Sequence, residues 1–498
     1  MADLPAFIWL LLVPLIATPF VYLVGRIFDV RGNLIARWAA LVVLGVTWLP
    51  FILAVLDLDQ NGADSYTLGT VTLRFDELSL LLAALSLGLS TVVVLYSAAY
   101  MQYEGRQEKY YACLTALTGV MIGLGCAGDL FNLWAWFEGM AIASFLLVAF
   151  YHEQANALEA GIKYLVQSAV GSALVMLGIA LVLANTGTLD LVEIRAAAGD
   201  STLLLAAGAL FVIGFGIKAA LVPMHTWLPD AHSQAPSGIS AMLSGVVIEA
   251  GLIAMLRSVA ALAGVSDAWG EMLMVFGVLN MVVGNLLALR QTQVKRLLAF
   301  SSLSHVGYML VGLGVAIYAN DATGAQGSLF HMLNHGLMKG LAFLAAGSLL
   351  YTLHVAAGSH APLTIADLNG AAKRYPLTAL GLSIAVLGLG GLPPLAGFMS
   401  KWQIFVAGFN THESWIQALI VFAALNSVLS LGYYAPLVNA LYREEESEAV
   451  VKGKRLPLTM SIPVVVLSVA VIVIGIWPAL LRWLAEPAGD ALLATFGF

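Results

Sequence analysis

Charged residues are scarce in this chain. Asp, Glu, Lys and Arg make up 10% of its 498 residues, whereas hydrophobic residues make up 60%. This balance lies far from that of soluble globular domains and predicts a membrane protein. The sequence also lacks a block of basic residues, so it gives no indication of nucleic-acid binding.

Residues that carry redox or nucleotide chemistry are also few. The two cysteines, Cys113 and Cys126, lie within one apolar segment and form no CxxC motif, so we interpret both as small apolar residues. The sequence contains no P-loop, no glycine-rich dinucleotide motif and no haem motif. We therefore expect neither a cofactor nor a metal. The driving force must come from partner subunits or from an existing ion gradient.

Apolar runs of about 20 residues, the length that crosses a bilayer, recur along the chain. They predict an all-α polytopic membrane protein with fourteen transmembrane helices. The seventh and twelfth segments are over-long and contain prolines that break the helix, because proline lacks a backbone donor. An alternating stretch, Ser65–Asp76, predicts a short extracellular hairpin or strand. The fourteen predicted ranges are 5–25, 36–57, 77–100, 110–127, 129–151, 159–184, 202–230, 237–262, 268–289, 296–318, 325–352, 376–407, 413–441 and 458–484.

Lysine and arginine residues are distributed unevenly between alternate loops. When successive loops are assigned to opposite sides, most of these residues, including Lys295, fall on one side and few, including Arg257, on the other. Cytoplasmic loops carry the excess of positive charge in membrane proteins. We therefore predict an integral protein of the bacterial plasma membrane with both termini on the outer side. Met1–Gly25 lacks the features of a cleaved signal peptide, so we expect it to be the first spanning helix.

Ionisable side chains also occur inside the predicted membrane helices, where a charge costs about 2.5–3.5 kcal/mol on insertion scales. Such residues usually face protein or water and mark ion pathways. His331, His335 and Lys339 are spaced at i, i+4 and i+8, so they share one helical face, which favours a proton wire. The residues predicted to transfer protons are Glu138, Lys218, Glu249, His305, His331, His335, Lys339 and Lys401.

Two of these lysines lie beside predicted helix breaks. Pro223 follows Lys218 in the seventh segment, and Pro393 and Pro394 precede Lys401 in the twelfth. Interrupted helices at matching positions in two blocks indicate an inverted repeat and mark ion sites. The predicted divisions are 1–109 with the first three helices and the short extracellular segment, 110–262 with the first five-helix repeat, 263–441 with the second, and 442–498 with a charged loop and the last helix.

Each ionisable residue has a structural alternative. Burial disfavours a charged form and a close opposite charge favours it, so a Glu138–Lys218 contact would keep both groups charged until they separate. The same contact is alternatively a static pair that only fixes packing. His305 alternatively hydrogen-bonds a neighbouring carbonyl, and Lys401 alternatively extends to the outer interface.

Three further ionisable residues follow the first break. His225, Asp230 and His232 occur in the stretch HTWLPDAH. Their spacing matches no familiar metal site, and three ligands are few for a structural metal. We expect them to line an inward-facing vestibule through which protons reach the membrane interior.

Several stretches resemble the signature of the antiporter-like membrane subunits of respiratory complex I, Mrp-type Na+/H+ antiporters and membrane-bound hydrogenases. The resemblance is carried by KAALVPMHTWLPDAHSQAPSGISAMLSGVV (Lys218–Val247) and supported by Phe131–Phe145, Val294–Met309, His331–Gly347 and Gly391–Trp402. It covers roughly residues 70–440. It implies fourteen helices, two inverted five-helix repeats, a charged axis along the membrane midplane, and partner membrane subunits in a hetero-oligomeric assembly.

The resemblance also implies which residues of this chain occupy the family's functional positions. Glu138 corresponds to the family's helix-five glutamate and Lys218 to its helix-seven lysine. His335 and Lys339 correspond to the connecting pair of helix eleven, and Lys401 to the terminal residue of helix twelve.

Glu249 departs from the family pattern, because relatives commonly carry a lysine or histidine there. Its carboxylate, expected near Lys218, would hold the lysine proton more tightly and puts a standard relay in doubt. Lys401 and the sequence stretches quoted above are most similar to those of the D-type component of Mrp antiporters. We therefore expect a proton-conducting subunit of a multi-subunit Na+/proton antiporter. The alternatives are the proton-pumping subunit of a redox-driven complex I-like or hydrogenase assembly, the membrane subunit of an inorganic-carbon pump, and a scaffold with degenerate channels.

Overall fold

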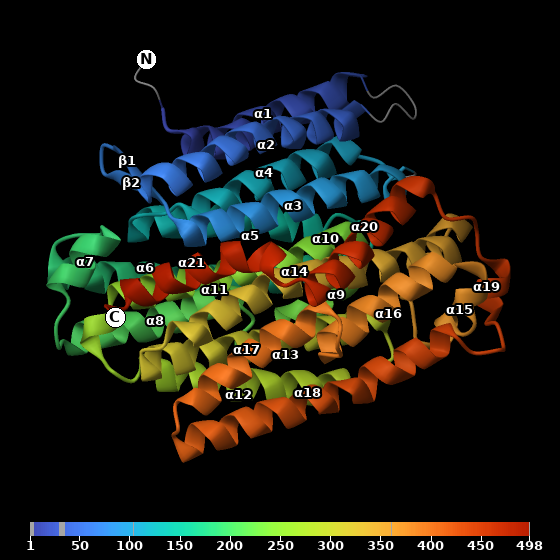
Figure 1. Cartoon of the computed structure of the whole chain (residues 1–498). Coiled ribbons are helices and arrows are strands. Elements are labelled where there is room, and N and C mark those ends of the chain that lie inside the picture. Colours follow the sequence, from blue (N-terminus) through green and yellow to red (C-terminus); the bar gives the residue numbers. More distant parts are fainter. Residues whose placement is uncertain (1–3, 29–34, 103, 360, 498) are drawn as a thin grey trace.

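The computed structural model describes residues 4–28, 35–102, 104–359 and 361–497. Within this part of the chain, long helices lie side by side in a bundle, and the only sheet is a small hairpin at one end (Figure 1). Eleven helices of the described residues are long and apolar enough to cross a membrane. The prediction of an all-α integral membrane protein is therefore confirmed.

The elements follow the predicted segments closely. The predicted hairpin forms as an antiparallel pair with Asp64 opposite Phe75, and its extracellular location stays a prediction. The elements are α1 (Ala6–Phe28), α2 (Ile35–Asn61), β1 (Asp64–Leu68), β2 (Val71–Phe75), α3 (Glu77–Tyr100), α4 (Gln107–Gly125), α5 (Leu130–Val148), α6 (Ala155–Thr186), α7 (Leu191–Ala197), α8 (Thr202–Lys218), α9 (Trp227–Gln234), α10 (Ser237–Met242), the π-helical turn η1 (Leu243–Val247), α11 (Ile248–Ala261), η2 (Ala263–Val265), α12 (Trp269–Ala288), α13 (Val294–Ala319), α14 (Ala322–Leu353), η3 (Val355–Ala357), η4 (Ala366–Leu368), α15 (Ala371–Arg374), α16 (Pro376–Gly390), α17 (Ala396–Asn410), α18 (Ser414–Leu441), α19 (Glu448–Lys452), α20 (Leu458–Ile476) and α21 (Ala479–Thr495).

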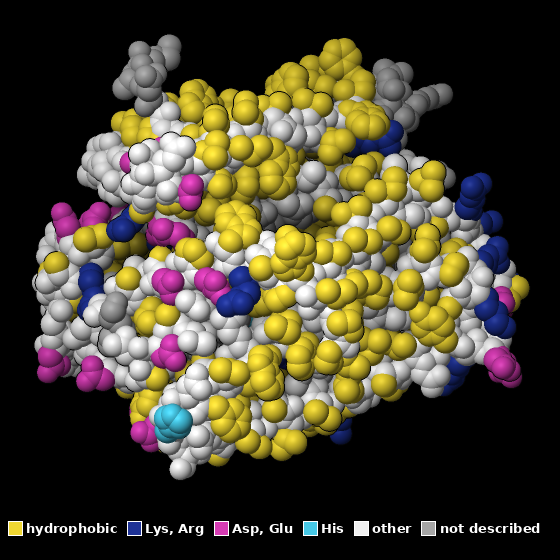
Figure 2. All heavy atoms as spheres, viewed as in Figure 1, with side chains coloured by type: hydrophobic (Ala, Val, Ile, Leu, Met, Phe, Trp, Pro, Cys, Tyr) yellow, Lys and Arg dark blue, Asp and Glu magenta, His cyan; other side chains and the backbone are white. Residues whose placement is uncertain are grey.

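Burial separates a central group of helices from a peripheral one. The spans of α10 to α11, α13 and α14 are buried almost throughout, whereas α1, α2, α6, α18 and α20 bury well under half of theirs. The peripheral helices expose large apolar side chains, such as Trp9 on α1 and Leu425 on α18. Figure 2 shows this hydrophobic surface between two charged ends, with Lys and Arg gathered at the right and most Asp and Glu at the left. Such a surface suits lipid contact. The side on which the termini lie stays a prediction.

Both predicted helix breaks are present. The first separates α8 from α9 and contains Pro223, and Asn280 of α12 satisfies its free backbone groups. The Asn280 amide accepts a hydrogen bond from the Val222 backbone N–H (2.8 Å) and donates one to the Ala220 carbonyl (3.2 Å). Irregular backbone is tolerated at membrane depth only where protein or water satisfies it in this way.

The second break separates α16 from α17 and contains Pro393 and Pro394. Side chains bond a backbone carbonyl on each side of this break. Ser427 donates to the Gly390 carbonyl (3.1 Å), and the Asn334 amide donates to the Ala396 carbonyl (3.0 Å). Both breaks are therefore stable, protein-lined interruptions in the bundle.

The predicted last helix is wrong at its C-terminal end. Instead of running over 458–484, the helix α20 ends at Ile476, and a separate helix, α21, begins after Pro478. A proline cannot continue the preceding helix because it lacks the backbone donor, but it is well tolerated at a helix start. Helix α21 then packs against α14 and α3.

Two basic residues that the sequence assigns to loops are buried instead. Arg257 lies within α11 and donates two hydrogen bonds to Asp76, at 3.0 and 2.7 Å, joining the N-terminal end of α3 to the core. Lys295 lies in the first turn of α13 and is only 6% exposed. The sequence does not reveal that these two residues are buried, because each lies within a few residues of a predicted helix end.

Candidate functional site

Lys218 is the last residue of α8 and is fully buried at the first helix break. Its Nζ atom has no hydrogen-bond partner and lies 3.8 Å from the centre of the Tyr164 ring and 5.9 Å from that of Trp227. A cation over an aromatic face gains about 2 kcal/mol when desolvated. The two aromatic faces are therefore among the groups that would stabilise a positive charge on Lys218.

The predicted contact between Glu138 and Lys218 is absent. No ion pair joins them among the described residues, and Oε1 of Glu138 is buried without a hydrogen-bond partner. A static pair that fixes packing is therefore not what the structure contains. Both groups have unused hydrogen-bonding capacity, which suits residues that gain and lose protons.

Close packing brings α11 against Lys218. A Cβ atom added at Gly251 would lie 2.8 Å from both the Lys218 Cβ and the Ala219 backbone nitrogen. Only glycine lets the two helices approach this closely. Gly251, rather than Glu249, is thus the residue of α11 that faces Lys218.

Glu249 contacts the helix α14 instead. Its Oε1 atom lies 2.9 Å from Nδ1 of His335, and both side chains are fully buried. The expected contact between Glu249 and Lys218 is therefore wrong. Oε2 of Glu249 and Nε2 of His335 have no hydrogen-bond partner, so each member of the pair keeps one polar atom that could exchange a proton with another group.

Three histidines from two helices meet beside this pair, and we call them the histidine array (His305, His331 and His335). Nδ1 of His305 lies 3.0 Å from Nε2 of His331, whose Nδ1 lies 2.9 Å from Oγ of Ser400. The His305 ring centre is 5.2 Å from those of both His331 and His335. Imidazole nitrogens both donate and accept protons, so the array connects Glu249 to the second break with one gap, between His335 and His305.

The two remaining lysines flank the array. Lys339 donates hydrogen bonds to the Leu298 carbonyl (2.7 Å) and to the Ser301 hydroxyl. Lys401 donates to the Leu389 carbonyl (2.8 Å) and the Ser427 hydroxyl (2.8 Å).

Lys401 also lies 4.5 Å from the Tyr308 ring centre and is only 3% exposed. It therefore does not extend to the interface. Because it bonds the Leu389 carbonyl in the last turn of α16, it also compensates the negative end of that helix.

The residues predicted to form a vestibule separate into two environments. His225 and Asp230 are partly exposed, and Asp230 pairs with Lys163 (2.9 Å) and Arg296 (2.7 Å). His232 is fully buried, stacks on Phe343, and has no partner on either ring nitrogen. Only the first two could line an open vestibule in this structure.

Several residues around these groups were not predicted. Tyr164, Ser301, Ser400 and Ser427 supply the ring face and hydrogen bonds that hold the ionisable side chains, and Asn280 holds the backbone of the first break. Their signal in the sequence is weak, because serine and tyrosine also occur in membrane helices for packing. Among the described residues, no group of three His, Cys, Asp or Glu side chains is placed to hold a metal ion.

Comparison with known proteins identifies the class. Residues 127–430 match the family described as NADH:quinone oxidoreductase/Mrp antiporter, TM, and residues 67–111 match the N-terminal part of complex I chain 5. The first match covers more than half of the chain, and the chain belongs to this family of proton-translocating membrane subunits. The predicted family is thus confirmed, and with it the expectation of partner membrane subunits.

Individual relatives and structures agree with this assignment. The chain is 32% identical to F(420)H(2) dehydrogenase subunit N of Methanosarcina mazei, with 96% of this chain and 97% of the relative covered. It is 33% identical to NADH-quinone oxidoreductase subunit N of Desulfitobacterium hafniense, with 84% of each covered. Its fold is similar to a chain of the archaeal membrane-bound sulfane sulfur reductase (TM-score 0.87, 28% identity, 98% of each covered). It is also similar to a chain of the Mrp complex from Dietzia (TM-score 0.87, 21% identity, 99% and 98% covered).

Proposed function

We propose that this chain is a proton-pumping membrane subunit of a redox-driven, complex I-like assembly. One observation carries the proposal: a buried series of titratable groups, from Glu249 through the histidine array to Lys401, crosses the centre of the bundle. Such groups are expensive in a membrane and are retained where they move charge. The relatives named as NADH-quinone and F(420)H(2) dehydrogenase subunits support a redox partner.

The geometry supports a stepwise transfer. A proton on His335 is stabilised by the Glu249 carboxylate, and rotation of either ring closes the gap to His305. His305 passes it along its hydrogen bond to His331, which bonds Ser400, and a second gap separates Ser400 from the Lys401 amine at the second break. In the proposed division into two inverted repeats, 110–262 and 263–441, Lys218 and Glu138 would serve the first half and this series the second.

The predicted antiporter function is supported less well. The similarity to the Mrp chain is 21% in sequence and therefore shows the fold alone. We also propose that the protein lies in the bacterial plasma membrane with both termini on the outer side. This proposal rests on the uneven distribution of Lys and Arg between alternate loops.

The test uses the assembled complex, purified through a tag on this chain and reconstituted into liposomes. We expect iron–sulfur or flavin subunits among the co-purified proteins, and donor-driven acidification that His331→Asn abolishes. His412→Asn is the matched control, since His412 is exposed and lies outside the array. Small antiporter subunits as partners, with sodium-dependent proton movement and no redox activity, would overturn the proposal. Unchanged pumping by the His331 variant would show that the array has no part in transfer.

A further inference from the structure

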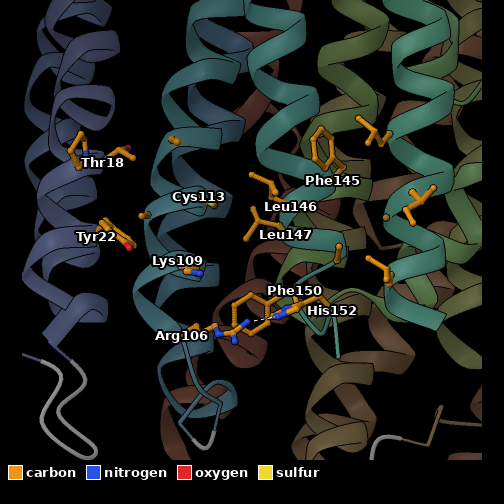
Figure 3. A pocket seen from close by; sticks show the side chains of 18 residues that line it. Thr18, Tyr22, Arg106, Lys109, Cys113, Phe145, Leu146, Leu147, Phe150 and His152 are labelled. Carbon is orange, nitrogen blue, oxygen red and sulfur yellow. Dashed lines mark hydrogen bonds between the residues drawn. The ribbon is translucent and has the colours of Figure 1, made fainter. Parts of the chain in front are cut away.

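A groove opens on the lipid-facing surface, away from the titratable groups. It lies between α1, α4, α5 and α6 and has a volume of about 760 Å³. Its walls are mostly apolar, with Phe145, Leu146, Ile162 and Leu165 among them. Figure 3 shows Thr18 and Tyr22 of α1 on one side and the α5 side chains on the other, with Cys113 of α4 between them. The groove is therefore a preformed apolar slot that the bundle itself does not fill.

Its polar end is basic. Arg106 and Lys109 at the start of α4 and His152 after α5 line this end, and no Asp or Glu is among the described lining residues. Arg106 hydrogen-bonds His152 across the end of the slot (Figure 3). Lys109 is exposed and has no ion pair within the described residues. Two cations at the mouth of an apolar slot match an amphipathic anion.

We propose that this groove binds one anionic phospholipid, with an acyl chain along the apolar walls and the phosphate at Arg106 and Lys109. Basic pockets between membrane helices on the cytoplasmic side bind such headgroups, and both residues lie on the side that the loop charges predict to be cytoplasmic. Along α4 the lining runs from Lys109 to Ala116, or about 10 Å at 1.5 Å per residue. That length is within one leaflet of a hydrocarbon core about 30 Å thick.

The size of the groove disfavours a helix of a partner subunit as its occupant. A membrane helix about 30 Å long and 10 Å wide occupies roughly 2,400 Å³, about three times the volume available. A partner helix would therefore cover the groove without entering it. An acyl chain is narrow enough to lie inside.

The first test measures bound lipid. The intact complex carrying Arg106→Gln and Lys109→Gln is purified, washed in detergent, and its phospholipids are quantified by mass spectrometry. The matched control is Arg290→Gln with Arg443→Gln, because both arginines are exposed and belong to the same set of loops. Each basic residue near a membrane surface contributes about five-fold in affinity for anionic lipid. We expect the first double variant to bind anionic lipid roughly 25-fold more weakly and the control to retain it. Equal retention by both would overturn the proposal.

The second test uses the thiol in the groove. Cys113 lines the slot, whereas Cys126 is fully buried, so a lipid-soluble maleimide should report on Cys113. We expect labelling of the complex to slow several-fold when phosphatidylglycerol replaces part of the phosphatidylcholine in the liposomes. Ala116→Phe, which fills the slot without changing charge, should abolish retained anionic lipid even if the charge variant fails to assemble. Labelling that is independent of lipid composition, or a cross-link from Cys113 to another subunit, would show a different occupant.

Discussion

Replacing Glu249 with glutamine isolates the charge of the Glu249–His335 pair. Glutamine has nearly the same shape and keeps an oxygen that can accept the hydrogen bond from His335, so the packing around α11 and α14 should persist. The carboxylate is lost, however, and no other Asp or Glu among the described residues forms an ion pair with the histidine array. The variant therefore tests whether the array must carry a positive charge during transport.

The magnitude follows from the geometry. The Oε1–Nδ1 distance of 2.9 Å places the centres of charge roughly 4 Å apart. At an effective dielectric constant near 20, such a pair is worth about 4 kcal/mol when both groups are ionised, as they are in the proposed transfer. Since about 1.4 kcal/mol is a factor of ten, the protonated state of His335 would become up to about 1,000-fold rarer. Relaxation and water entry reduce this figure, so we expect proton transport to fall by at least about ten-fold.

The assay is donor-driven acidification in liposomes that contain the assembled complex, at matched expression and across a range of pH. Glu271→Gln is the control, because it makes the same chemical change at an exposed position on α12. We also expect Glu249→Lys, which places a cation against His335, to change the pH dependence of transport. If both Glu249 variants gave profiles that overlay that of Glu271→Gln, the pair would have no part in proton transfer.

Three further substitutions test other parts of the structure. Lys218→Ala should strongly reduce proton transport in a complex that still assembles on a native gel; wild-type rates would show that this lysine only fills space. Gly251→Ala should reduce transport because its Cβ would displace Lys218, whereas Gly88→Ala, with no atom within 4 Å of the added Cβ, should not; equal rates would refute this. Arg257→Met should lower the stability of the subunit by about 3–5 kcal/mol, since it leaves Asp76 buried and unpaired, and an unchanged midpoint of detergent or thermal unfolding would contradict it.

The sequence contains strong signals for the fold and for the two helix breaks. Apolar runs of spanning length cannot be mistaken for soluble helices, and Pro223 and Pro393 remove backbone donors wherever they lie. The end of the last membrane helix is harder to place, because apolar residues continue from α20 past the turn at Trp477 and Pro478 into the start of α21, before Arg482. Hydropathy alone therefore overestimates the length of the segment.

The membership of the site is easier to predict than its contacts. An ionisable residue inside an apolar run is conspicuous, and the shared face of His331 and His335 follows from their spacing. Helical spacing does not give the rotation of one helix against another. Glu249 and Gly251 are two residues apart, so they point roughly 200° apart around α11. If Gly251 faces Lys218, Glu249 must face away from it, and the structure places it against α14.

This arrangement makes α11 the element shared by the two parts of the site. One of its faces packs on α8 beside Lys218, and the opposite face holds the carboxylate that contacts His335. The π-helical turn η1 immediately precedes it, and such turns occur frequently at functional sites because they change the phase of the helix that follows. A small rotation of α11 at this turn would move Gly251 against Lys218 and Glu249 against His335 together. In the proposed division into two repeats, coupling between the halves would therefore need no direct contact between Lys218 and the histidine array.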